Sequence, residues 1–378
     1  MNAKAPSFLH ALILAAVFLT TLPAYTAGSG VACAASAPGE STRKVQELYE
    51  GHNDVTKKRL NLIFVGARYH DLKEFRRIAC ELIALKGENA RGLLQMKPYN
   101  DPGCRYYFNF WIYDTVPRIG KSPQTITNED VWQCLSGTLN TVMEDFSRES
   151  GRRFTRGDRD ICAVLLANVD PRENPRYGYG GGSFGRTATF TVWHTLHPWF
   201  SWDDMIVTHV HELMHSIPEF YDEISGPGSI YDDTSWSTAD GKGQFFIPGS
   251  AGDRGGITKE RFIRLSPAAQ YDYVKRNCPW RHLMGNGYGA PGVMDSIDEE
   301  AYRTGRKFIP RGSHEPLMDL EIGIFEGGRG REKHIYRSTK NSLMNYPYGL
   351  IPGKSLGLGL HLEQLARKRL SEEFQKTH

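Results

Sequence analysis

The sequence predicts an α/β fold. Short apolar runs with the composition of strands alternate with segments in which apolar residues recur at helical spacing, and this alternation covers the first half of the chain. Short apolar runs bounded by polar loops are typical of buried strands, whereas a period near 3.6 residues indicates amphipathic helices. The chain shows no internal repeat that would favour a solenoid or a propeller instead.

The first elements follow a polar segment. Residues 59–66 (RLNLIFVG) contain a continuous apolar core and predict a buried strand, and residues 71–85 carry apolar positions at helical spacing. The same reasoning predicts strands at 106–113 and 161–168 and a helix at 130–146.

The central part of the chain begins with a loop. Residues 176–185 are rich in glycine and tyrosine and predict an irregular segment that helps to shape a cleft. A strand-like run at 187–194 follows, and then a helical pattern at 202–217, for which Ser201 can serve as N-cap. Two further helical patterns lie at 259–276 and 355–376.

Composition restricts the possible partners. The chain has 378 residues, of which 40% are hydrophobic and 24% are charged, an ordinary balance for a globular protein. Its 46 Lys and Arg nearly equal its 43 Asp and Glu, giving a net charge of +3. Because a polyanion-binding surface needs an excess of positive charge, we expect no nucleic-acid partner.

The amino terminus resembles a secretory signal peptide. Lys4 precedes a short apolar run at 8–22, and small residues follow, so residues 1–34 are expected to be cleaved and the protein secreted or periplasmic. A lipoprotein with its lipid on Cys33 is the minor alternative, because Gly30 stands where a leucine-like residue would be needed. No other run approaches about 18 apolar residues, so we expect no transmembrane segment in the mature chain.

Beyond the signal peptide, residues 35–58 are polar and predict a linker or a short pro-segment. No linker divides the chain after residue 59, so residues 59–378 are expected to form a single domain. The chain has 6 cysteines without a C-x-x-C pair, which argues against a thiolate zinc site.

The strongest functional signal is an H-E-x-x-H motif at 211–215. His211 and His215 are four residues apart, which on a helix places both imidazoles on one face, where they can bind one Zn²⁺. Glu212 lies beside the first ligand and can take a proton from a water molecule, as the general base of a zinc hydrolase does. His209 points away from this face and is expected to pack in the core or behind the ligands.

A catalytic zinc usually has three protein ligands. Pro218 should end the motif helix, and the chain then reaches Asp222 and Glu223. Either carboxylate could fold back to the metal. Asp222 is the preferred third ligand and Glu223 is the alternative, while a solvated acidic turn is the interpretation that needs no metal.

The segment Ser342-Leu343-Met344-Asn345-Tyr346-Pro347 resembles the Met-turn of the metzincin metallopeptidases. The resemblance implies that Met344 forms a hydrophobic floor beneath the zinc and that Tyr346 helps to stabilise the transition-state oxyanion. Plain core packing is the other interpretation of Met344.

Together these motifs are similar to the M64 (IgA peptidase) family of zinc metallopeptidases. Asp222-Glu223 after the H-E-x-x-H motif, the segments 277–282, 323–328 and 335–338, and the Met-turn follow that family's order over about residues 59–347. The resemblance implies a metzincin-like fold of the α+β kind. In that fold a twisted mixed sheet lies over the active-site helix, followed by the Met-turn and a carboxy-terminal helix, all in one catalytic domain.

The motifs and the resemblance imply a secreted zinc-dependent endopeptidase that acts on protein or peptide substrates, with one catalytic Zn²⁺ as cofactor. One alternative is a zinc hydrolase of another substrate class, such as a deacylase. A second is a non-catalytic binding module with a structural metal. Structural zinc sites are closed by four protein ligands, whereas the sequence offers three and a base.

Overall fold

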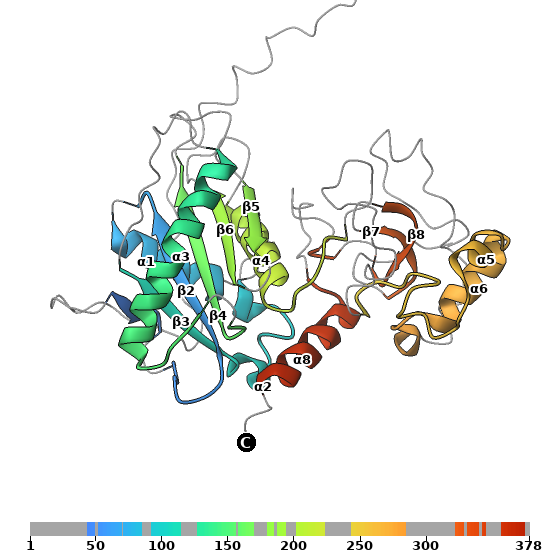
Figure 1. Cartoon of the computed structure of the whole chain (residues 1–378), viewed down its shortest axis with the longest axis horizontal. Coiled ribbons are helices and arrows are strands. Elements are labelled where there is room, and N and C mark those ends of the chain that lie inside the picture. The colour runs from blue at the N-terminus through green and yellow to red at the C-terminus, as the bar shows by residue number, and fades with distance from the viewer. Residues whose placement is uncertain are drawn as a thin grey trace, which may run out of the picture. The chain divides into compact units, whose positions relative to one another are not determined.

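The computed structural model describes residues 44–49, 52–69, 71–84, 92–114, 127–155, 158–169, 180–184, 187–193, 202–223, 243–284, 322–328, 331–339, 342–344 and 357–374. These residues all belong to one unit, Cys33–His378. The expected signal peptide, the possible lipid site at Cys33 and the predicted N-cap Ser201 lie outside the described residues. Figure 1 shows the helices and strands with the labels used below.

A six-stranded mixed sheet forms the first part of the fold, with strand order β1-β3-β2-β4-β6-β5. The four inner strands are parallel, and the two edge strands, β1 and β5, run antiparallel to their neighbours. The strands are β1 (Val45–Glu47), β2 (Leu60–Ala67), β3 (Phe108–Tyr113), β4 (Ile161–Asn168), β5 (Gly180–Phe184) and β6 (Ala188–Trp193). The predicted α/β class is therefore confirmed at the level of a mixed sheet with helices.

Helices cover both faces of this sheet (Figure 1). Helix α3 (Asn128–Ser150) packs on one face, where its apolar residues share a core with alternate residues of β2 and β4. On the other face, Phe75 of α1 (Leu72–Ala84) lies against Gly66, and His209 of α4 (Trp202–Ser216) contacts the Phe64 ring. Burial on both faces explains why β2 and β4 are almost wholly apolar.

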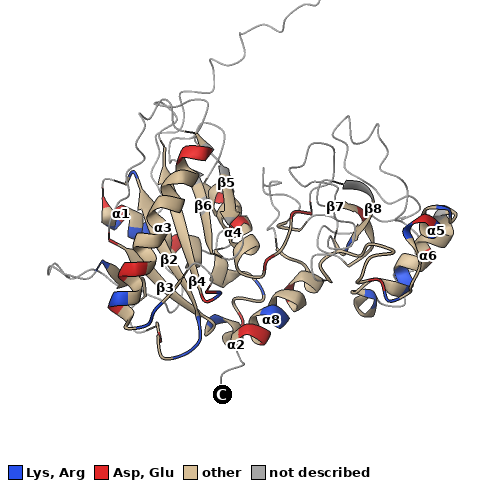
Figure 2. Ribbon diagram, viewed as in Figure 1, with Lys and Arg blue, Asp and Glu red and all other residues tan. Residues whose placement is uncertain are grey.

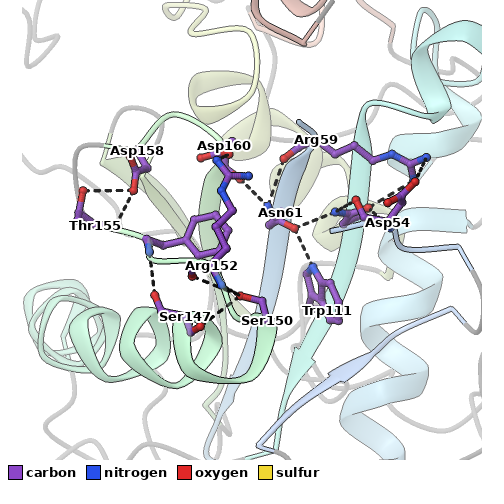
Figure 3. Close-up of polar contacts among 12 residues, drawn as sticks. Asp54, Arg59, Asn61, Trp111, Ser147, Ser150, Arg152, Thr155, Asp158 and Asp160 are labelled. Atoms are coloured by element: carbon purple, nitrogen blue, oxygen red, sulfur yellow. Dashed lines mark hydrogen bonds and ion pairs between the residues drawn. The ribbon is translucent and has the colours of Figure 1, made fainter. Parts of the chain in front are cut away.

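A buried polar group fixes the alignment of the inner strands (Figure 3). Asn61 donates from its amide to the carbonyls of Arg59 and Asp160, at 3.2 and 2.9 Å. Its oxygen accepts from Asn109 at 2.9 Å and from the Trp111 indole at 3.0 Å. Because Asn61 is only 3% exposed, each of these bonds satisfies a group that water cannot reach easily.

The second part of the described fold is built around a hairpin of β7 (Phe325–Gly328) and β8 (Arg331–Arg337), beside a cluster that contains Trp280. The remaining helices are η2 (Leu93–Gln95), α2 (Pro102–Arg105), α5 (Lys259–Ile263), α6 (Pro267–Asn277), η5 (Arg281–Leu283) and α8 (Leu360–Phe374). Figure 2 shows both basic and acidic residues on α8. Among the described helices, none is long and apolar enough to cross a membrane.

Three elements differ from the sequence prediction. Strand β1 lies in the predicted polar segment 35–58 and pairs with β3, with Leu48 buried just after it, so the folded part begins before residue 59. Strand β5 occupies the predicted loop 176–185. The predicted helix 259–276 is two helices, because Pro267 starts the second one and the Ser266 side chain caps it.

Candidate metal centre

Helix α4 carries the H-E-x-x-H motif into the interior. Eleven of its fifteen residues are buried, and the helix packs against β5 and β6 of the sheet. The helix ends at Ser216, two residues before Pro218, whose ring is incompatible with a further turn. His211 and Glu212 are buried, and His215 is slightly more exposed.

Three side chains converge in front of this helix: His211, His215 and Asp222. The two imidazole Nε2 atoms lie 3.2 Å apart, and the Asp222 Oδ1 atom lies 3.0 Å from the first and 3.4 Å from the second. Tetrahedral zinc with bonds of 2.0–2.1 Å separates its ligand atoms by about 3.3 Å. The three atoms therefore already stand at the separations that one tetrahedral cation requires.

Backbone carbonyls orient both rings. The His211 Nδ1 atom is 2.9 Å from the Leu343 carbonyl oxygen, and the His215 Nδ1 atom is 2.7 Å from that of Phe220. A carbonyl only accepts, so each Nδ1 carries its proton and donates. In the neutral rings the Nε2 lone pairs therefore face each other and the carboxylate, an arrangement that a bound cation stabilises.

Electrostatics in the polypeptide alone favour positive charge at the same point. Burial would lower the pKa of His215, but the hydrogen bond and the charge of Asp222 raise it to about 9. Burial would raise the pKa of Asp222, but the two imidazoles hold it well below its usual range. Asp222 is therefore an ionised carboxylate that attracts positive charge to this point.

Glu212 lies beside this cluster. Its side chain is buried, and burial raises the pKa of its carboxyl group, although His211 and His215 act in the opposite direction. A buried carboxyl group with a raised pKa next to a candidate metal site is suited to take up and release a proton.

The structure brings Asp222, and not Glu223, to the two imidazoles. Glu223 points the other way and is fully buried, and burial raises the pKa of its carboxyl group. Its Oε2 atom accepts a hydrogen bond from Ser342 Oγ at 2.6 Å, and its backbone N–H donates to the Met344 carbonyl at 2.8 Å. Glu223 thus ties the segment that carries Asp222 to the turn at 342–344.

That turn contacts the site through three consecutive residues. Ser342 bonds to Glu223, the Leu343 carbonyl accepts from His211, and the Met344 carbonyl accepts from the Glu223 backbone. Met344 is completely buried. Tyr346 lies outside the described residues.

The chain between His215 and Asp222 turns sharply at Glu219, whose φ of 56° is unusual for a residue other than glycine. Two arginines hold this turn. Arg159 pairs with the Glu219 carboxylate at 2.8 Å, and Arg369 of α8 donates to the carbonyls of Pro218 and Glu219. The left-handed turn directs the following residues back toward the helix.

His209 is the packed core residue that the sequence predicts. It is fully buried, its Nδ1 atom lies 3.1 Å from Thr191 Oγ1, and burial lowers its pKa to about 3. The ring is therefore neutral and ties α4 to β6.

The sequence did not reveal the roles of Glu223, Ser342 and Leu343. Two of these interactions use backbone carbonyl or amide groups, which leave no signature in residue type. Comparison of the sequence with models of known protein families finds no match, and comparison with curated proteins finds none either.

Proposed function

We propose that this protein is an exported zinc-dependent endopeptidase, with a metzincin-like fold and kinship to the M64 family. One observation carries the proposal. Two imidazoles and a carboxylate place their ligand atoms 3.0 to 3.4 Å apart, directly beside the buried Glu212. The expected amino-terminal signal peptide supports export.

In this proposal His211, His215 and Asp222 hold the metal. When bound, Zn²⁺ would make a water molecule more acidic and polarise the carbonyl group of the substrate. The carbonyls of Leu343 and Phe220 keep both imidazoles in the tautomer that presents Nε2 to the cation. Met344 would provide an apolar floor.

Glu212 acts as the general base. It accepts a proton from the attacking water and later delivers that proton to the nitrogen of the leaving amine, so that one peptide bond and one water give a carboxylic acid and an amine. Tyr346 donates a hydrogen bond to the oxyanion of the transition state, a type of contact worth about 3 kcal/mol when it is removed.

The choice of a peptide substrate rests on the resemblance of the motifs to M64 peptidases. A deacylase would use the same ligands and the same base on another substrate class. A structural metal in a binding module would need a fourth protein ligand, and among the described residues only three ligand candidates converge.

The test combines metal analysis with digestion of a mixed peptide library and of acylated substrates. We expect about one zinc per chain, peptide products from the purified protein and no products after chelation. Glu212→Gln should retain its zinc and lose turnover. Full peptidase activity of Glu212→Gln would refute the mechanism, and turnover of acylated substrates alone would favour the deacylase.

A further inference from the structure

We infer that Gly181 is a positioning residue for Glu212. The absence of a side chain at this position of the edge strand β5 leaves the space that the glutamate side chain occupies. The inference rests on the proposed role of Glu212 as general base, although the steric relation between the two residues can be tested without any activity.

The contact is close. A Cβ atom built on Gly181 would lie 2.5 Å from Glu212 Cγ, 2.8 Å from Oε1 and 2.9 Å from Cδ. Ordinary contacts of a Cβ atom begin at 3.4 Å, so an alanine would require a displacement of about 0.9 Å. Glycine inside a strand weakens the strand and often marks a point where another group approaches closely.

The helix cannot easily retreat from the strand. Gly181 pairs with Thr191 in the β5–β6 ladder, and Thr191 Oγ1 lies 3.1 Å from His209 Nδ1 on α4. His209 and Glu212 are three residues apart, so they share one face of the helix. Since Thr191 and His209 are both fully or almost fully buried, this bond sets the helix against the same rung of the sheet that carries Gly181.

The other side of the helix is fixed as well. The His211 ring is held by the Leu343 carbonyl, and Glu212 itself is only 5% exposed. A methyl group at position 181 would therefore move the Glu212 side chain rather than the helix. The ligand atoms of the candidate metal centre would stay in place, because the contact that Gly181 makes is to the glutamate.

The first test is kinetic, on the zinc-loaded protein. Because a displacement of about 1 Å can cost roughly 100-fold in rate, Gly181→Ala should lower kcat about 100-fold with little change in KM. Its zinc affinity, measured by competition with a chelator, should stay within about twofold. Gly137→Ala is the matched control, because a Cβ atom at Gly137 in α3 meets nothing within 4 Å. Unchanged kcat in Gly181→Ala would overturn the inference.

The second test is a double-mutant cycle on thermal stability, which needs no turnover. Gly181→Ala should lower Tm by a few degrees in the wild-type background and leave it unchanged in the Glu212→Ala background, where the obstructing side chain is gone. An equal loss in both backgrounds would show that Gly181 is needed for another reason. If Gly181→Ala does not fold, folding of the double variant supports the inference, and its failure refutes it. If the double-mutant cycle shows this coupling but the protein has no peptidase activity, the steric relation between Gly181 and Glu212 stands and only the proposed function is refuted.

Discussion

The third metal ligand gives the sharpest prediction, because adjacent carboxylates have different surroundings. Asp222→Ala removes the oxygen that lies 3.0 Å from one imidazole and 3.4 Å from the other. Glu223→Gln changes a side chain that contacts the turn at 342–344 and lies away from the imidazoles. The two variants therefore distinguish a residue that binds the metal directly from a residue that only holds the segment of a ligand in place.

The expected magnitudes follow from the group that each substitution removes. Zinc binding to a four-ligand site amounts to about 10–16 kcal/mol, which is roughly 2.5–4 kcal/mol per ligand. Asp222→Ala should thus weaken zinc binding by roughly 10²- to 10³-fold. Glu223→Gln keeps an oxygen that can accept from Ser342, so we expect a decrease in zinc affinity of about tenfold, typical of a residue that supports a ligand.

Competition with a chelator of known zinc affinity measures both variants on one scale, and far-UV circular dichroism controls for folding. Peptidase activity at saturating zinc should return in Glu223→Gln and stay low in Asp222→Ala. If Asp222→Ala binds zinc as tightly as the wild type while Glu223→Gln loses it, Glu223 is the ligand and the proposed arrangement is wrong.

Three further predictions concern stability. Asn61→Ala should lower the free energy of unfolding in urea by about 3 kcal/mol, because it removes four hydrogen bonds of a side chain that is only 3% exposed; a decrease below about 0.5 kcal/mol would contradict this. Burial lowers the pKa of His361 from 6.5 to about 4, so the folded protein favours the neutral imidazole. The stabilisation that this neutral ring provides is complete above pH 6.5 and is lost as the pH falls toward 4. His361→Gln should flatten that acid limb in urea titrations at several pH values, and an unchanged limb would exclude His361 as its source. Arg369→Ala should raise the susceptibility of the turn at Glu219 to limited proteolysis and weaken zinc binding several-fold, because it removes the donor of two carbonyls that precede Asp222. Wild-type proteolysis and wild-type zinc affinity would show that the turn keeps its conformation without Arg369.

The sequence predicts elements well where local pattern and burial agree. Strand β4 is found at the predicted residues 161–168, because an apolar run of this length can be satisfied only in the interior. Helix α4 begins at the predicted residue and ends one residue early. Strand β5 was missed, because three of its five residues are glycines and its pairing depends on β6 rather than on intrinsic preference. The break between α5 and α6 was missed because apolar spacing continues across Pro267.

The candidate site, too, could be predicted only where local geometry determines it. The two histidines and the glutamate of the motif could be located because one helix places them by local geometry. The sequence favoured Asp222 over Glu223 as the third ligand, but residue type alone could not decide between two carboxylates. What separates them is the turn at 342–344, which engages the buried Glu223 through Ser342 and leaves Asp222 facing the imidazoles.

The candidate ligand His211 depends on a distant carbonyl, so the helix alone cannot complete the site. His211 and Leu343 are 132 residues apart, yet the tautomer of the ring is set by the bond between them. The H-E-x-x-H helix can therefore form locally, but a site with correctly oriented imidazoles requires the turn at 342–344 to have docked. Ser342→Ala should accordingly weaken zinc binding by about tenfold or more while leaving the helix content unchanged. Because Ser342 Oγ also accepts from the Met344 N–H at 3.1 Å, the serine both shapes the turn and attaches it to Glu223. Chelator competition together with circular dichroism would test this order, and undiminished zinc affinity in Ser342→Ala would show that the turn docks without the serine.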